Sequence, residues 1–211
     1  MPFILQYMQP LIGVWQIGES ESALLSQLSH TAAYAPFLEK LANKRRRSEW
    51  LAVRVLLKEL LGEELPVAYY PNGAPYLPGK DIHLSISHTR DYAAVALGKY
   101  PTGIDIEYRG DRVLKVKSRF LCREEEAFID PRHEAAHALV CWCAKEALYK
   151  CIGRSDMDFK KNLRLQPFAY GEAGCISATG TYPGREESFR LNYLVSKNFV
   201  MCWLLDSSAV S

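Results

Sequence analysis

The sequence predicts an α+β fold made of two similar subdomains, each a small sheet packed on a long helix, in a pseudo-twofold arrangement. Three observations lead to this prediction. Helix-like and strand-like segments follow one another in a similar order twice along the chain. Each half contains one strong amphipathic helix that a glycine ends, and each half closes with strands. We expect the subdomains at residues 1–100 and 103–211, with the active site at their interface, because ligand sites favour such clefts.

The strongest element of the first half is an amphipathic helix. Trp50, Val53 and Leu57 recur at helical spacing, and Gly62 ends the pattern. Around this helix we expect a strand at 11–17, short helices at 20–30 and 32–42, a turn-rich stretch at 66–78, and strands at 82–87 and 92–97, with the helix itself at 45–61.

The second half repeats this plan around its own strong helix. Pro131 stands at the start of that helix and Gly153 follows its end, which is the usual asymmetry of helix termini. The expected elements are a strand at 103–107, a helical region at 118–129, the helix at 132–151, and strands at 175–178, 189–196 and 199–205.

The two strong helices can be aligned with one another. Each carries a tryptophan, a charged residue four positions later and a lysine eight positions later: Trp50, Arg54 and Lys58 in the first helix, and Trp142, Glu146 and Lys150 in the second. These positions share one helical face. An internal repeat explains the match, and chance similarity between two amphipathic helices is the alternative.

Composition limits the classes of function. The chain has 211 residues, of which 48% are hydrophobic and 24% charged, so it is expected to be globular. Its net charge of +2 does not favour broad nucleic-acid binding. Its apolar runs are shorter than the ~18 residues of a membrane helix. Six cysteines without a CxxC pair and no recognisable signal peptide predict a cytoplasmic protein with free thiols, and we expect a monomer.

An acidic pair marks the strand at 103–107. Asp105 and Glu107 are two residues apart, so on a strand they point to the same face, while Ile104 and Ile106 point to the core. Adjacent carboxylates repel, and proteins mostly accept that cost to bind a hard divalent cation. The alternative is an exposed strand edge with solvated acids.

A third acid lies on the second strong helix. Glu146 shares a face with Trp142 and Lys150, near surface that is expected to be buried, so its charge needs a partner. Lys150 alone could supply this partner. Three acids together with Lys145 and Lys150 are explained more economically by a magnesium site for a pyrophosphate, in which the lysines neutralise the phosphates.

These residues also carry a family resemblance. GIDIE at 103–107, followed about 35 residues later by WCAKEALYK, resembles the paired signature of the larger, pseudo-dimeric 4′-phosphopantetheinyl transferases. Further motifs are similar to those of the family: GAPYL at 73–77, SISH at 85–88, RFLCREE at 119–125, and the arginines Arg45 and Arg54. The matching motifs run from about residue 40 to residue 150.

The resemblance implies an activity and its partners. Such an enzyme transfers 4′-phosphopantetheine from coenzyme A to a serine of an apo acyl or peptidyl carrier protein and releases 3′,5′-ADP, with Mg²⁺ as the cofactor. The metal ligands implied are Asp105, Glu107 and Glu146. The residues implied to bind coenzyme A are His88, Ser87, Arg45, Lys40, Lys145 and Lys150.

The catalytic residues implied are Glu146, Glu125 and Lys150. The serine of the carrier protein must lose a proton as it attacks the β-phosphorus, and both Glu125 and Glu146 are candidates for the base. Carrier proteins are acidic as a class, so the basic stretch at 112–119 is a candidate docking surface. An ordinary solvated loop is the alternative interpretation of that stretch.

Two positions depart from the family pattern. Ala74 stands where the family usually has a phosphate-binding lysine or arginine, so one contact is missing or comes from a nearby basic residue. Cys122 replaces the serine or threonine that would cap the following helix, at a cost of about 1 kcal/mol.

Two alternative functions compete with this hypothesis. Residues 133–137 read HEAAH and match HExxH, so His133 and His137 could share a zinc ion with Glu134 as the base of a hydrolase. A third ligand is not evident for such a site. The other alternative is a non-catalytic pseudoenzyme that binds carrier proteins, which Ala74 favours.

Overall fold

The computed structural model describes residues 3–8 and 10–205. Its first half forms a six-stranded antiparallel sheet in the order β1-β2-β6-β5-β4-β3. The strands are β1 (Phe3–Met8), β2 (Leu11–Gln16), β3 (Ala68–Tyr69), β4 (Pro75–Tyr76), β5 (His83–Thr89) and β6 (Tyr92–Gly98). The helices are α1 (Glu21–Leu25), α2 (Thr31–Lys40) and α3 (Lys44–Leu61).

The second half forms a five-stranded antiparallel sheet in the order β7-β11-β10-β9-β8. Its strands are β7 (Ile104–Tyr108), β8 (Leu163–Leu165), β9 (Ala173–Tyr182), β10 (Arg185–Val195) and β11 (Phe199–Leu204). Its helical segments are the 3₁₀ turn η1 (Asp111–Lys115), α4 (Lys117–Phe120), α5 (Arg123–Glu126) and α6 (Glu134–Ile152). The α+β class with two similar subdomains is confirmed.

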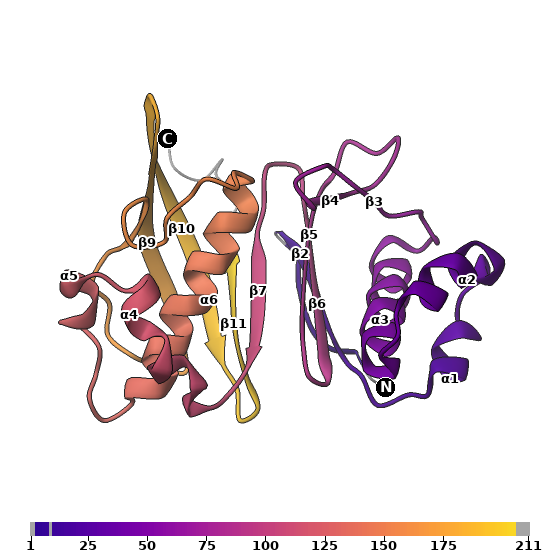
Figure 1. Cartoon of the computed structure of the whole chain (residues 1–211), viewed down its shortest axis with the longest axis horizontal. Coiled ribbons are helices and arrows are strands. Elements are labelled where there is room, and N and C mark those ends of the chain that lie inside the picture. Colours follow the sequence, from indigo (N-terminus) through magenta and orange to yellow (C-terminus); the bar gives the residue numbers. More distant parts are fainter. Residues whose placement is uncertain (1–2, 9, 206–211) are drawn as a thin grey trace.

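Four layers make up the molecule, in the order α3, first sheet, second sheet, α6 (Figure 1). β6 is buried on both faces because Ala93 and Val95 pack toward α3, whereas Ala94 and Ala96 pack toward the second sheet. β11 is also buried on both faces, because its side chains pack alternately toward α6 and toward the first sheet. The central layer of apolar contacts therefore joins the two sheets face to face.

Both strong helices end where the sequence predicts. Gly62 and Gly153 adopt left-handed φ angles of 72° and 70° at the C-caps of α3 and α6, a conformation that glycine tolerates without strain. The expected helical region at 118–129 is broken into α4 and α5, because Leu121 is extended and its side chain is buried.

The hairpin of β9 and β10 is longer than the sequence predicts. It projects beyond the rest of the second sheet (Figure 1), and its strands run over 173–182 and 185–195 rather than 175–178 and 189–196. Alternating exposed and buried residues cover much of both strands, and polar side chains such as Glu186 and Glu187 conceal the strand signal.

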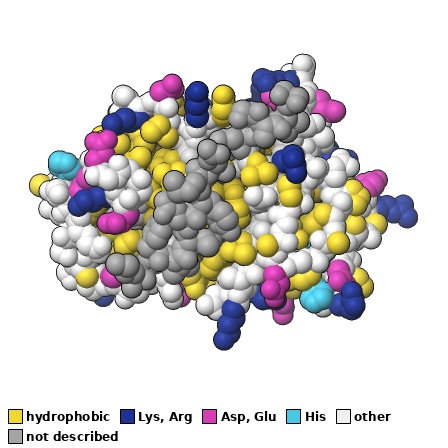
Figure 2. Space-filling model, turned by 180° about the vertical axis from the view of Figure 1, so that it is seen from behind, with side chains coloured by type: hydrophobic (Ala, Val, Ile, Leu, Met, Phe, Trp, Pro, Cys, Tyr) yellow, Lys and Arg dark blue, Asp and Glu magenta, His cyan; other side chains and the backbone are white. Residues whose placement is uncertain are grey.

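The outer surface carries both signs of charge. On the face shown in Figure 2, lysine and arginine side chains stand apart from one another and alternate with acidic and hydrophobic ones. Of the helices described, none combines the length and the apolar composition needed to span a bilayer.

Candidate active site

The acidic pair lies on β7 with the predicted alternation. Ile104 and Ile106 are 0% and 1% exposed and pack in the core between the two sheets. Asp105 and Glu107 point the other way, toward α6 and the first sheet's β5. Asp105 is 5% exposed and Glu107 is half-buried. The pair is therefore not a solvated strand edge.

Gly103, just before β7, allows the chain to pass close to the backbone of α6. A Cβ atom on Gly103 would lie 1.9 Å from the carbonyl oxygen of Ala147, so only glycine fits here without a shift of the backbone. The close approach places Lys150 of α6 over the start of β7. Its Nζ donates to the Ile104 carbonyl at 2.9 Å and to Asp105 Oδ1 at 2.7 Å.

The two oxygens of Asp105 have different surroundings. Oδ1 accepts from Lys150 Nζ and from the Ser87 hydroxyl at 2.8 Å. Oδ2 is buried and has no hydrogen-bond partner among the described residues. A buried carboxylate oxygen without a partner is costly, and a cation at this point would remove that cost.

Glu107 is held from two elements. Its Oε2 accepts from the Thr89 hydroxyl of β5 at 3.2 Å, and its carboxylate also accepts a hydrogen bond from the side chain of Trp142 on α6. Burial, and then the nearby Asp105 carboxylate, raise the pKa of Glu107 above its usual value.

Glu146 faces the same acids from α6. Burial raises its pKa to about 7, with Asp105 and Glu107 adding to the rise and Lys150 opposing it. We call Asp105, Glu107 and Glu146 the carboxylate cluster. As they stand, no three His, Cys, Asp or Glu side chains in the described part of the chain are placed to hold a metal ion. The oxygen donors and the unpartnered Asp105 Oδ2 fit Mg²⁺ in chemistry.

The raised pKa of Glu146 leads to a prediction for the metal-free protein. A folded-state pKa near 7, above the usual 4.5, means that the folded chain holds this proton more tightly than the unfolded chain. With a chelator present, the unfolding free energy of the wild type relative to Glu146→Gln should therefore fall as the pH rises from about 4.5 to about 7. Urea unfolding of both proteins across this pH range measures the difference in unfolding free energy. A difference that stays constant with pH would contradict the prediction.

A basic group surrounds His88 at the end of β5. Its Nδ1 lies 3.3 Å from Oε2 of Glu49, a carboxylate on α3 that is 4% exposed. Arg45 Nε contacts the same carboxylate at 2.9 Å, and Arg46 lies 3.6 Å from it. Burial lowers the pKa of His88, while Glu49 acts against this. The side chains of Arg45 and Arg46 are more than half exposed, which leaves them available to an anion.

Two adjoining cavities follow the boundary between the subdomains. The larger, of about 450 Å³, is lined by residues that include Arg46, Trp50, Arg54, His88 and Lys150. The smaller, of about 200 Å³, is lined by residues that include Ala74, Lys150 and Arg154. Both share Gly73, Pro75, Ile86 and Lys150, so we treat them as one groove. Its size suits a nucleotide-sized ligand.

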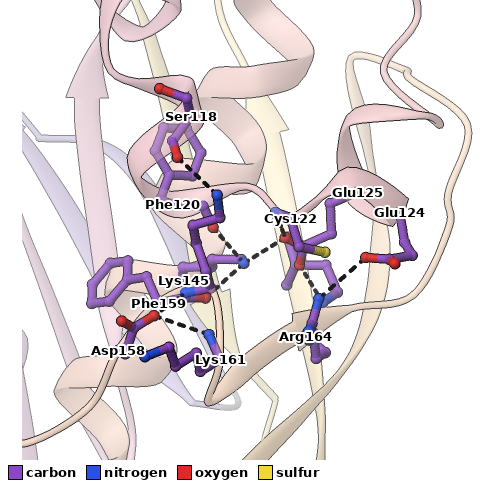
Figure 3. Close-up of polar contacts among 12 residues, drawn as sticks. Ser118, Phe120, Cys122, Glu124, Glu125, Lys145, Asp158, Phe159, Lys161 and Arg164 are labelled. Atoms are coloured by element: carbon purple, nitrogen blue, oxygen red, sulfur yellow. Dashed lines mark hydrogen bonds and ion pairs between the residues drawn. The ribbon is translucent and has the colours of Figure 1, made fainter.

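Lys145 and Glu125 lie elsewhere (Figure 3). Lys145 is 0% exposed, and its Nζ donates to Glu125 Oε2 at 2.7 Å and to the carbonyls of Phe120 and Phe159 at 2.7 and 2.8 Å. Glu125 is 2% exposed and also accepts from the backbone N–H groups of Cys122 and Leu165. All three ammonium donors are used, so this structure does not place either residue where it could meet a phosphate or a substrate hydroxyl.

Three other expectations concern Ser87 and Lys40 as coenzyme A contacts and the stretch at 112–119 as a docking surface. The Ser87 hydroxyl is directed at Asp105, and the residue is 7% exposed. Lys40 Nζ lies 6.0 Å from the centroid of the Phe37 ring at the end of α2. The basic stretch at 112–119 folds into η1 and α4, where Lys117 pairs with Glu134.

The HExxH motif does not present a pair of histidines to a metal. His137 is 0% exposed, and its Nδ1 accepts from the Asp130 N–H at 3.1 Å. His133 Nδ1 lies 3.0 Å from Asp130 Oδ2. The two rings instead pack around Tyr170, His133 by stacking and His137 at a tilt, so the motif serves the core of the second subdomain.

Comparisons with known proteins agree with the motifs. A model of the 4′-phosphopantetheinyl transferase superfamily matches residues 101–200, and a model of the 4′-phosphopantetheinyl transferase N-terminal domain matches residues 33–98. The chain belongs to the 4′-phosphopantetheinyl transferase superfamily. The carboxylate cluster and most of the groove lie within the two matched ranges.

Two curated relatives of this superfamily are similar to the chain. The 4′-phosphopantetheinyl transferase gsp of Aneurinibacillus migulanus is 29% identical over 118 residues, which are 49% of this chain and 49% of the relative. The 4′-phosphopantetheinyl transferase of Bacillus subtilis is 29% identical over 86 residues, 39% of this chain and 38% of the relative. The aligned parts thus span about half or less of these transferases.

Three side chains that contact residues of this site are not predicted from the sequence. Thr89 and Trp142 both donate hydrogen bonds to Glu107, and Glu49 links His88 to the arginines of α3. Sequence signals existed for two of them. Thr89 follows Ser87 at strand spacing, and Glu49 stands four residues after Arg45 on a helix.

Proposed function

We propose that this protein transfers 4′-phosphopantetheine from coenzyme A to a serine of an apo acyl or peptidyl carrier protein in a Mg²⁺-dependent reaction that releases 3′,5′-ADP. One observation carries the proposal. Three carboxylates from β7 and α6 gather with Lys150 beside a groove whose other end holds His88 and exposed arginines. Membership of the superfamily supports the same assignment.

Asp105, Glu107 and Glu146 would hold the magnesium ion. Bound Mg²⁺ would neutralise charge that develops on the pyrophosphate as 3′,5′-ADP leaves. Lys150 approaches the same place from α6 and would contact a phosphate oxygen as a point charge. At the far end of the groove, His88, Arg45 and Arg46 would bind the remaining phosphate of coenzyme A.

The attacking serine would come from the carrier protein, and its proton needs an acceptor. Glu125 is occupied by Lys145 in the core, so Glu146 remains as the candidate base. Its pKa of about 7 belongs to the metal-free protein, and bound Mg²⁺ would lower this pKa and keep the carboxylate ionised. Most of the rate enhancement would come from placement and charge neutralisation rather than from covalent chemistry on the enzyme.

Position 74 lacks a cation, and Arg154 supplies one nearby. Arg154 lines the same cavity as Ala74 and pairs with Asp156 at 2.8 Å on the protein surface. We propose that Arg154 provides the phosphate contact that Ala74 cannot make. We also assign residues 1–100 and 103–211 to the two domains, with the reaction at their interface.

We further propose a cytoplasmic location, with which the six free cysteines accord.

The test is direct. The protein is incubated with coenzyme A, Mg²⁺ and an apo carrier protein, and the mass of the carrier is measured. A gain of one phosphopantetheine group, lost when EDTA replaces Mg²⁺, is the expected result. Binding of the carrier without a gain in mass would instead identify a non-catalytic carrier-binding protein.

A further inference from the structure

β7 is an edge strand of the second sheet. An edge strand pairs on one side only, so alternate backbone N–H groups lack a partner within the sheet. β7 pairs with β11, and β5 of the first sheet runs alongside its open edge (Figure 1). The outward N–H groups of β7 therefore face another subdomain rather than water.

Three hydroxyl groups on β5 accept these N–H groups. Ile104 N donates to Ser85 Oγ at 3.1 Å, Ile106 N to Ser87 Oγ at 3.3 Å, and Tyr108 N to Thr89 Oγ1 at 3.1 Å. We call Ser85, Ser87 and Thr89 the hydroxyl ladder. Both sets of residues advance by two, so the ladder joins two strands that run in the same direction and fixes their register.

Two members of the ladder also touch the carboxylate cluster. Each hydroxyl has one proton, and after accepting an N–H it donates that proton elsewhere. Ser87 donates to Asp105 Oδ1 at 2.8 Å, and Thr89 donates to Glu107 Oε2 at 3.2 Å. No carboxylate of the described residues is hydrogen-bonded to the third member, Ser85, whose side chain accepts from Ile104. The ladder thus links the register of the subdomains to the orientation of two acids.

We propose that Ser87 and Thr89 are positioning residues that orient Asp105 and Glu107 for a divalent cation. The proposal rests on the metal-dependent function proposed above. Ser87 and Lys150 together occupy Asp105 Oδ1, which leaves Oδ2 directed away from them and without a partner. Hydrogen bonds from neighbouring groups commonly orient metal-binding carboxylates in this way.

The test compares four variants by Mn²⁺ titration in the absence of coenzyme A, because Ser85 and Ser87 also line the groove, with free Mn²⁺ followed by electron paramagnetic resonance. Thr89→Val keeps the shape of the side chain but removes the hydroxyl, and Thr89→Ser restores it. Ser87→Ala removes the contact to Asp105. Ser85→Ala is the matched control, because it removes a rung of the ladder that has no carboxylate contact.

We expect Thr89→Val and Ser87→Ala to bind Mn²⁺ roughly tenfold more weakly than the wild type, whereas Thr89→Ser and Ser85→Ala bind it like the wild type. Unchanged affinity in both Thr89→Val and Ser87→Ala would overturn the proposal. Equal weakening by Ser85→Ala would overturn it too, since strand pairing alone would then explain the effect. If the wild type bound no Mn²⁺, the metal site of the proposed function would itself be wrong.

Hydrogen exchange gives a readout that does not depend on metal. The backbone amide of Tyr108 should exchange faster in Thr89→Val than in the wild type, because its acceptor is lost, and Thr89→Ser should restore the slow rate. The amide of Ile104, which uses Ser85, serves as an internal control. An unchanged rate for Tyr108 in Thr89→Val would contradict the ladder.

Discussion

Replacing Asp105 by asparagine should lower phosphopantetheine transfer at least about a hundredfold, because a metal ligand contributes several kcal/mol of charge stabilisation. Asparagine keeps the size of the side chain and can still accept from Ser87 and Lys150, so the fold should survive. What is lost is the negative charge beside the unpartnered Oδ2. The rate is measured as carrier-protein mass gain over time at saturating coenzyme A.

Asp81→Asn is the matched control for this substitution. Asp81 is an exposed aspartate in the loop before β5 and lies outside the groove-lining sets named above, so its variant should transfer at the wild-type rate. Circular dichroism and thermal unfolding establish that both variants are folded. Near-normal turnover by Asp105→Asn would remove Asp105 from the metal site and leave the proposed chemistry without its central ligand.

Replacing Lys145 by methionine should destabilise the second subdomain by about 3–5 kcal/mol, which is the usual cost of breaking a buried ion pair from one side. Glu125 would keep a buried charge without its cation, and the carbonyls of Phe120 and Phe159 would lose their donor. Urea unfolding measures this loss as a shift of the midpoint at constant slope. Lys161→Met is the control, because Lys161 is exposed, and it should change the unfolding free energy by less than about 0.5 kcal/mol.

A double-mutant cycle makes the test sharper. Lys145→Met combined with Glu125→Gln should be less destabilised than the sum of the two single variants, because the second change removes the stranded charge. Coenzyme A binding by the folded fraction is measured in parallel. A stable Lys145→Met variant that fails to bind coenzyme A would show that Lys145 meets the phosphates after all.

Lys145 and Lys150 lie in different surroundings although they are close in the sequence. Both lysines belong to the same helical motif, but successive residues on a helix are turned by about 100°. Lys150 is four residues after Glu146 and shares its face, whereas Lys145 lies with Cys141 and Leu148, which are both fully buried. The spacing to these two core residues was visible in the sequence and would have predicted the buried position.

By itself, the sequence determined the class of fold, the two long helices with their glycine ends, and the two faces of β7, because each follows from local periodicity and backbone preference. Only the tertiary structure decided which side chains meet across the subdomain boundary. Ser87 and Thr89 reach the acids of β7 because the first sheet covers an open strand edge, and Glu125 of α5 meets Lys145 of α6 although the two are 20 residues apart in the chain. Such contacts join residues distant in the chain, and spacing along one element carries no information about the element that packs against it.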